Sequence, residues 1–181
     1  MPYELKKTVV LVGMMGSGKT AIGTTLARLL EVPFLDSDAE IEAAADRTIA
    51  EIFDRDGEAF FRKKETMVLS RLLDNERCIL STGGGAYMSD CNQALVSEKG
   101  VAVWLRADLE ILWSRVKNKN TRPLLRTANP KKTLKDLCVK RNPRYAHADL
   151  TVESKREYSL DMMAQKVIEA LLTRPDVLER H

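Results

Sequence analysis

Residues 9–20 read Val9-Val10-Leu11-Val12-Gly13-Met14-Met15-Gly16-Ser17-Gly18-Lys19-Thr20, an apolar run that breaks into glycines and ends on Lys-Thr. From Gly13 onward they fit G-x-x-x-x-G-K-[ST], a pattern in which successive backbone N–H groups surround nucleotide phosphates. The alternative is a plain glycine turn. It is disfavoured because an apolar, β-branched run precedes the glycines and Ile22, Leu26, Leu29 and Leu30 follow at helical spacing. The stretch predicts a strand, a phosphate-binding loop and a helix.

The residues expected to hold the nucleotide are Gly13, Met14, Met15, Gly16, Ser17, Gly18, Lys19 and Thr20. Glycine lets the backbone turn where a Cβ would clash, and the following helix offers unpaired N–H groups and the positive end of its dipole. Lys19 adds a mobile cation. The Thr20 hydroxyl is placed to bind a Mg²⁺ ion that bridges the β- and γ-phosphates. The side chains of Met14 and Met15 are expected to pack in the core.

The chain has 181 residues and no Pro-, Gly- or Ser-rich linker, so we expect a single domain over residues 1–181. The net charge of +3 is mild but unevenly distributed. Residues 36–58 are acidic, whereas the stretch from Arg115 to Arg144 holds one acid, Asp136, among many basic residues. Such a block suits anionic small ligands. Aromatic residues are not interleaved with it, so we expect no nucleic-acid partner.

The cysteines Cys78, Cys91 and Cys138 are odd in number and lack C-x-x-C spacing, which favours free thiols over a metal site or a disulfide framework. Free thiols are typical of a reducing compartment and predict a cytoplasmic protein. The apolar run after Lys6 and Lys7 is too short for a signal peptide, and no run is long enough to cross a membrane. We therefore expect no membrane partner, and we expect a monomer.

Strand and helix patterns alternate along the chain, which favours an α/β fold with a parallel sheet. Apolar runs predict strands near residues 8–12, 33–36, 78–82, 101–106 and 149–153. Helical spacing predicts helices over residues 19–30, 38–45, 48–54, 57–74, 89–98, 108–117, 131–141 and 159–173. We expect a three-layer fold of the kind found in P-loop NTPases and nucleoside monophosphate kinases, with a central five-stranded parallel sheet flanked by helices.

Two acids, Asp36 and Asp38, follow the second expected strand. Residues two apart on an extended segment project to the same side, and ligands of open α/β sheets bind beyond the carboxyl ends of the strands. Both carboxylates can therefore face the cleft beside the phosphate loop. The structural alternative is equally supported, because Ser37-Asp38-Ala39-Glu40 fits a capping box.

Arg62 follows two aromatic residues and precedes a basic pair. An arginine near apolar surface can grip a carboxylate with its two-pronged guanidinium, although an ordinary surface side chain fits the local sequence somewhat better. A second glycine-rich turn, Gly83-Gly84-Gly85, follows the third expected strand. Three glycines expose bare backbone that can bind an anion or let a substrate ring approach, and this exceeds what a plain turn needs.

A polar, basic connection runs over residues 118–126 and contains Arg122 and Pro123. Asn118-Lys119 is like the start of the guanine-reading N-K-x-D pattern, but Thr121 stands where that pattern needs aspartate. The connection is better explained as a lid, over about residues 118–130, that brings Arg122 to the transferring phosphate.

Taken together, these residues resemble the shikimate kinase family from Leu11 to about Leu172. The phosphate loop alone is shared by many unrelated NTPases, so the resemblance depends on further motifs in family order and spacing. They are Asp36-x-Asp38, Phe61-Arg62 with Glu65, Gly83-Gly84-Gly85, Arg122-Pro123-Leu124-Leu125 and Arg141-x-x-x-Tyr145.

The resemblance implies Mg²⁺-dependent transfer of the ATP γ-phosphate to the 3-hydroxyl of shikimate, in chorismate biosynthesis. Lys19 and Arg122 would neutralise the γ-phosphate, Thr20 and, through water, Asp36 would bind the metal, and Asp38 would face the substrate hydroxyl. Lys19, Asp38 and Arg122 are thus the expected catalytic residues. The substrate-binding segment would span about residues 36–65. The other expected contacts are Arg115 at adenine, Arg62 and Arg141 at the shikimate carboxylate, Gly83, Gly84 and Gly85 along the ring, and Phe53 and Phe61 near it.

The chain departs from the family pattern at Asp46, where a helix usually ends on glycine with positive φ, which Asp tolerates better than most residues. Residues 154–159, expected beside adenine, match no family pattern, and residues 173–181 lie beyond the resemblance. Two other functions stay open: a related kinase acting on gluconate or a nucleoside monophosphate, and a nucleotide-binding module without turnover. The Arg62/Arg141 pair with Asp38 disfavours the first, and intact Lys19 and Thr20 disfavour the second.

Overall fold

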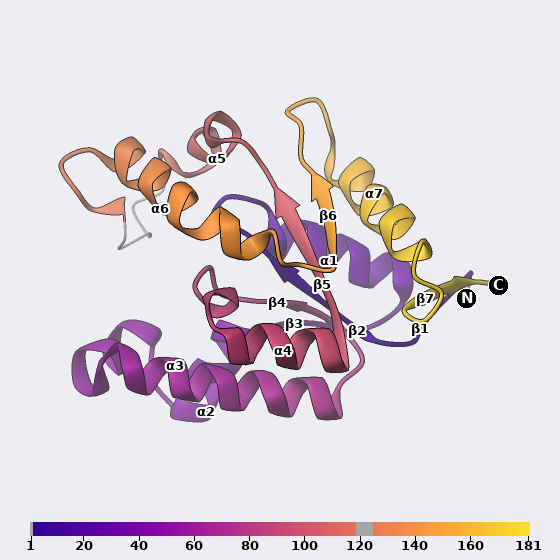
Figure 1. Cartoon of the computed structure of the whole chain (residues 1–181), viewed down its shortest axis with the longest axis horizontal. Helices are drawn as coiled ribbons and strands as arrows, with labels where there is room; N and C mark the ends of the chain where they lie inside the picture. The colour runs from indigo at the N-terminus through magenta and orange to yellow at the C-terminus, as the bar shows by residue number, and fades with distance from the viewer. Residues whose placement is uncertain (1, 119–124) are drawn as a thin grey trace.

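The computed structural model describes residues 2–118 and 125–181, so the expected lid arginine, Arg122, lies outside the described residues. Within these ranges the core is a five-stranded sheet in the order β3-β4-β2-β5-β6, and each neighbouring pair is parallel (Figure 1). Its strands are β2 (Thr8–Val12), β3 (Phe34–Asp36), β4 (Ile79–Ser81), β5 (Gly100–Arg106) and β6 (Leu150–Glu153). The predicted parallel sheet is confirmed.

Helices cover both faces of this sheet and create two apolar layers. The helices are α1 (Lys19–Leu30), α2 (Ser37–Ala45), α3 (Ile49–Asn75), the 3₁₀ turn η1 (Ala86–Met88), α4 (Asp90–Lys99), α5 (Leu109–Val116), α6 (Pro130–Tyr145) and α7 (Leu160–Leu172). Val9 and Leu11 of β2 face the layer formed with α1 and α7, whereas Val10 and Val12 face the layer formed with α3, α4 and α6. Because β2 has no solvent side, it is buried at every position.

The predicted break between helices near residue 57 is present as a kink within α3. Gly57 has φ 84° and ψ 169°, a backbone conformation that is essentially limited to glycine. The end of α2 also agrees with the sequence, because Asp46 adopts the left-handed conformation, with φ 52°, and its N–H donates to the Glu42 carbonyl. The chain therefore turns sharply at Asp46, before α3 begins, and again at Gly57 within α3.

The ends of the described chain meet in a second, two-stranded antiparallel sheet that the sequence analysis does not predict. It pairs β1 (Tyr3–Leu5) with β7 (Leu178–Arg180), so residues 173–181 do have a structural role. In Figure 1 this pair lies at the opposite end of the sheet from the loops that follow β2 and β5. Among the described helices, none combines the length and apolar character that spanning a membrane requires.

Candidate active site

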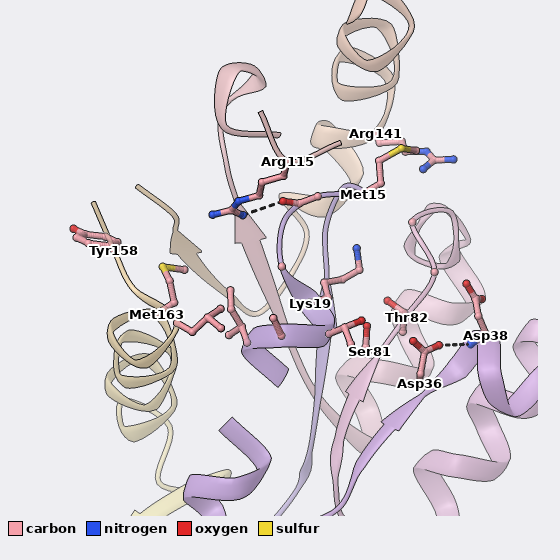
Figure 2. Close-up of a pocket in the computed structure, with 18 of the residues that line it drawn as sticks. Met15, Lys19, Asp36, Asp38, Ser81, Thr82, Arg115, Arg141, Tyr158 and Met163 are labelled. Carbon is pink, nitrogen blue, oxygen red and sulfur yellow. Dashed lines mark hydrogen bonds between the residues drawn. The ribbon is translucent and has the colours of Figure 1, made fainter. Parts of the chain in front are cut away.

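A cleft of about 520 Å³ opens beyond the carboxyl ends of the central strands. β2 leads into the phosphate loop, β3 into Asp36 and α2, and β4 into Thr82 and the glycine run. Figure 2 shows Lys19 between the two acids on one side and Tyr158 and Met163 on the other, and Met15 and Arg141 also line the cleft. The topology thus brings residues from distant parts of the chain to one edge of the sheet, as open α/β sheets do for their ligands.

The phosphate loop folds round the side chain of Lys19. Its Nζ donates to the carbonyl oxygens of Gly13 at 2.7 Å and Met14 at 3.1 Å. Gly18 has φ 92° and precedes α1 without any side-chain cap, and a Cβ there would lie 3.0 Å from Ile22 Cδ1. The first N–H groups of α1 are therefore left to an anion, which is the arrangement that nucleotide phosphates require.

The methionines and the serine of the loop have different environments. Met14 is 2% exposed and belongs to the core, as expected, and Met15 is partly buried against the same core while it also lines the cleft. Ser17 is buried, and its Oγ has no hydrogen-bond partner among the described residues. The surface that this loop offers to a ligand is thus mainly its backbone.

Thr20 and Asp36 both line the cleft and offer the oxygen atoms that Mg²⁺ prefers. Asp36 uses Oδ1 to cap α2, accepting from the N–H groups of Asp38 at 2.9 Å and Ala39 at 3.2 Å. In the part of the chain that the structure describes, no group of three or more His, Cys, Asp or Glu side chains could hold a metal ion by itself. These residues fit a magnesium ion held largely by water and nucleotide phosphates.

Asp38 faces the cleft from the first turn of α2, close to the glycine run. A Cβ on Gly83 would lie 2.9 Å from Asp38 Oδ1. Burial and the nearby charge of Asp36 raise the pKa of Asp38, against smaller opposing effects of Lys19 and Arg62. Oδ1 is buried without a hydrogen-bond partner among the described residues, which is costly unless a ligand donates to it.

The sequence allows two roles for Asp36 and Asp38, capping the helix that follows or facing a ligand in the cleft, and the structure gives one role to each residue. Asp36 caps α2, one residue earlier than the capping box predicted at Ser37, while Asp38 has a carboxylate oxygen that suits a ligand hydroxyl.

Arg62 is held in place and does not behave as a freely solvated surface side chain. Its Nη1 donates to Glu65 Oε1 at 2.9 Å, and its Nε forms an ion pair with Glu58 Oε1 at 3.6 Å. Glu65 is 1% exposed, and burial raises the pKa of its carboxyl despite the opposing effect of Arg62. The Arg62 guanidinium also lies 5.2 Å from the centroid of the Phe61 ring, which in turn packs on Phe53. Phe53 and Phe61, which the family resemblance places near the substrate ring, are not among the residues that line the cleft.

Arg62 and Arg141 approach the main chain of the glycine run from α3 and α6. A Cβ on Gly84 would lie 2.6 Å from Arg141 Nη1, and one on Gly85 would collide with the Arg62 guanidinium. Arg62, Gly85 and Arg141 line a hollow of about 310 Å³, and Arg141 also lines the main cleft. The absence of side chains at these glycines is what lets two guanidinium groups lie beside one backbone segment.

Arg115 of α5 joins the phosphate loop to the segment after β6. Its Nη1 donates to the Gly16 carbonyl at 2.9 Å and its Nη2 to Ser154 Oγ at 3.2 Å, and burial lowers the pKa of Arg115. Tyr158 and Met163 line the same part of the cleft. Sequence reasoning predicts Arg115 and expects residues 154–159 beside adenine, but it does not single out Ser154, Tyr158 or Met163 as cleft residues.

Most of the predicted site residues lie on the two hollows. These are Met15, Gly16, Gly18, Lys19, Thr20, Asp36, Asp38, Arg62, Gly83, Gly84, Gly85, Arg115 and Arg141. Arg122 cannot be placed because it lies outside the described residues. The roles of all these residues stay predictions.

Comparison with known proteins agrees with this geometry. A family model described as shikimate kinase matches residues 15–172. The chain belongs to the shikimate kinase family. A shikimate kinase from Cereibacter sphaeroides is 65% identical over 97% of this chain and 88% of its own length. Another, from Ruegeria pomeroyi, is 60% identical over 97% of this chain and 90% of its own length.

A solved structure from the same family has the same fold. It is a shikimate kinase from Acinetobacter baumannii in complex with shikimate, with a TM-score of 0.85 and 39% identity over 92% of this chain and 93% of that chain. The expected P-loop kinase architecture is confirmed by this match.

Proposed function

We propose that this protein is a shikimate kinase. It transfers the γ-phosphate of ATP to the 3-hydroxyl of shikimate with Mg²⁺, giving shikimate 3-phosphate and ADP for aromatic amino acid biosynthesis. The observation that carries the proposal is that one edge of the sheet joins the phosphate loop, the unpartnered Oδ1 of Asp38 and the Arg62/Arg141 pair. Family membership supports the same acceptor and the same cofactors, ATP and Mg²⁺.

The chain supplies position and charge, on which phosphoryl transfer chiefly depends. The uncapped N-terminus of α1 and Lys19 hold the phosphates of ATP in line with the acceptor. Asp38 accepts a hydrogen bond from the 3-hydroxyl and takes its proton as the oxygen–phosphorus bond forms and the bond to ADP breaks. Thr20 and, through water, Asp36 would hold Mg²⁺, which would supply charge neutralisation at the phosphate oxygens.

Substrate selection falls to the arginines and the glycine run. Arg62 and Arg141 grip the shikimate carboxylate with paired N–H groups, and Gly83, Gly84 and Gly85 let the ring approach the main chain. Arg115 packs on adenine. Arg122, carried by a lid over about residues 118–130, reaches the transferring phosphate after both substrates have bound.

We further propose that residues 1–181 work as a single kinase domain, with residues 36–65 as its substrate-binding segment, and that the protein is a cytoplasmic monomer. Three free cysteines, two of them buried, suit a reducing compartment. Sedimentation or light scattering at working concentrations measures the oligomeric state, and binding of RNA or vesicles would contradict the expected absence of such partners.

The decisive experiment measures ADP release from MgATP with shikimate, gluconate, AMP and CMP in turn. We expect turnover with shikimate at least a hundredfold above the other acceptors, because each charged contact in the clamp contributes about 1.5–3 kcal/mol. Preference for gluconate or a nucleotide would identify a related kinase instead. ATP binding without turnover of any acceptor would identify a nucleotide-binding module.

A further inference from the structure

The second peptide of the glycine run, Gly84–Gly85, is held by a residue that is distant in sequence. The Gly83 carbonyl accepts from Ala86 N at 3.1 Å and the Gly85 carbonyl from Met88 N at 3.2 Å, so both are paired within the local turn. The Gly84 carbonyl instead accepts from the phenol hydroxyl of Tyr145, at the end of α6. This contact joins two segments that are 61 residues apart.

The Gly84–Gly85 peptide needs such a contact more than an ordinary peptide does. Glycines flank it on both sides, so it can rotate with little steric cost. Because a peptide is planar, the Gly84 carbonyl and the Gly85 N–H point in opposite directions, and fixing the carbonyl fixes the direction of the N–H. The Tyr145 hydroxyl therefore determines which backbone surface the glycine run presents to the cleft.

The turn that follows is anchored by other side chains. Asn92 Nδ2 donates to the Ala86 carbonyl at 2.8 Å, Gln93 Nε2 to the Tyr87 carbonyl at 2.8 Å, and Arg144 Nη2 to the Met88 carbonyl at 3.1 Å. These contacts hold η1 and do not reach the Gly84–Gly85 peptide. Within the part of the chain that the structure describes, Tyr145 is the side chain whose hydrogen bond reaches the carbonyls of the glycine run.

Tyr145 is buried and keeps its hydroxyl proton over the working pH range. Its side chain is fully buried, and its ring lies 5.9 Å, centroid to centroid, from that of Trp104. Burial raises the pKa of Tyr145 to about 12, so the hydroxyl keeps its proton and donates at any working pH. Arg141 lies one helical turn earlier on α6, with Nη1 near the Gly84 backbone. The same end of α6 thus supplies both a carboxylate-binding guanidinium and the contact that orients the glycine run.

We propose that Tyr145 is a positioning residue for the acceptor site. Its hydroxyl holds the Gly84–Gly85 peptide in the orientation that shikimate contacts. It also keeps that backbone in a fixed position relative to the Arg141 guanidinium. This inference rests on the proposed function, because the affected ligand is shikimate. Tyr145 acts through the backbone and does not take part in the chemical step.

The test uses Tyr145→Phe, which removes one oxygen atom and leaves the ring against Trp104. Tyr87→Phe is the matched control, because Tyr87 is 2% exposed and its hydroxyl donates to the carbonyl of His147, away from the cleft. Calorimetric titration gives the Kd of shikimate and of a non-hydrolysable ATP analogue, and steady-state assays give kcat and KM. Hydrogen exchange on peptides that cover residues 82–88 reports the mobility of the glycine run.

We expect Tyr145→Phe to raise the shikimate Kd and KM about tenfold, with kcat reduced less than about threefold, because an unpaired buried carbonyl lets the loop leave its binding conformation. The Kd of the ATP analogue should change less than about twofold, and exchange over residues 82–88 should accelerate. Tyr87→Phe should lower thermal stability similarly and leave the shikimate Kd unchanged.

The inference alone would be overturned by a shikimate Kd near wild type in Tyr145→Phe, or by an equal loss of shikimate affinity in Tyr87→Phe. A parallel loss of ATP binding would assign Tyr145 a general structural role and overturn it too. If Tyr145→Phe does not fold, hydrogen exchange in the wild type provides the test. Exchange over residues 82–88 as fast as that of exposed turns would contradict a held loop. If wild-type protein does not phosphorylate shikimate, the proposed function itself fails.

Discussion

The carboxylate of Asp38 is placed where it suits a ligand better than it suits the free protein. Burial and repulsion from Asp36 raise its pKa, and Oδ1 has no hydrogen-bond partner among the described residues. Binding of an acceptor hydroxyl would provide the missing donor. Active-site groups of this kind commonly lower the stability of the free protein in exchange for function.

We predict that Asp38→Asn reduces kcat at least about a hundredfold, because an amide cannot accept the hydroxyl proton and orients it less well. Steady-state assays over pH 5–9 measure this loss. In wild type, kcat/KM should decline with falling pH, and the midpoint of this decline should lie at a pH above the ordinary carboxyl range, since the pKa of Asp38 is raised. Activity near wild type in the variant would contradict a role for Asp38 in transfer.

The same variant should be more stable than wild type near neutral pH. A folded-state pKa above the unfolded value means that the ionised carboxylate opposes folding, so wild type loses stability as pH rises from about 3.8 through the raised value. The gap in Tm between variant and wild type should therefore be widest at pH 7 and close toward pH 4. Asp54→Asn, an exposed change on α3, should show no such gap.

Arg62 is pre-oriented by Glu65 and Phe61, so its geometry should matter as well as its charge. We predict that Arg62→Lys raises the shikimate KM roughly 10–100-fold, since lysine cannot form the two-pronged contact worth about 1.5–3 kcal/mol. Arg71→Lys, on the exposed side of the same helix beside Glu40, should leave it unchanged. A fall in ATP affinity with shikimate affinity intact would show that Arg62 does not bind the carboxylate.

Some residues of the candidate site could be predicted from the sequence and others could not. Spacing and family order place Lys19, Asp38 and Arg62, because their motifs are local. The Arg115–Ser154 and Tyr145–Gly84 contacts join segments 39 and 61 residues apart, and no short-range pattern encodes such a pairing. The Arg62–Glu65 pair is different, since its i,i+3 spacing on a helix could have indicated it.

Element prediction succeeds where burial is continuous along a segment. β2 and β5 are central and buried on both faces, so their sequences are uninterrupted apolar runs that leave little ambiguity. β1 and β7 have only three residues each, and only Leu5 and Leu178 among them are buried. Patterns this short show no periodicity from which a strand could be predicted. The kink in α3 is predictable because glycine marks it.

The proposed lid gives a prediction at the level of one element. Arg122 precedes Pro123-Leu124-Leu125 in the sequence, and we propose that this segment brings a cation over the cleft and excludes water from the γ-phosphate. We predict that Arg122→Ala lowers kcat roughly a hundredfold or more, with smaller changes in the Kd of either substrate, because comparable arginines act chiefly in the transition state. Rapid-mixing binding experiments and steady-state rates separate the two effects.

Lys117→Ala is a suitable control for the lid, because Lys117 is an exposed basic residue just before it. It should retain wild-type turnover. If Arg122→Ala keeps kcat within tenfold and loses ATP affinity in proportion, Arg122 is a ground-state phosphate contact.

The cleft and the pairing of the two chain ends lie in different parts of the molecule. The cleft lies beyond the carboxyl ends of the strands, and the β1–β7 pair lies at their amino ends (Figure 1). Val177 and Leu178 are buried against the layer formed by α1 and α7, which secures the end of α7 to the start of β2. The start of α7 lines the cleft, so α7 spans the distance between the two regions.

This arrangement predicts that a change at β7 lowers stability without altering substrate binding. Leu178 is 1% exposed, and Leu178→Ala should cost about 2–4 kcal/mol, from lost burial and the cavity left behind. That corresponds to a fall in Tm of roughly 5–12 °C for a chain of this size. The shikimate and ATP KM values, measured well below the unfolding transition, should stay within about twofold of wild type, because no contact of the cleft changes.

Glu179→Ala tests whether burial is the cause, since Glu179 is exposed and forms a surface ion pair with Lys6 at 2.9 Å. It should cost at most about 1 kcal/mol, the usual range for exposed pairs. Equal losses in the two variants would mean that β7 contributes little core packing. A tenfold rise in the shikimate KM of folded Leu178→Ala would mean instead that α7 transmits changes along its length, and that the two ends of the sheet are energetically coupled.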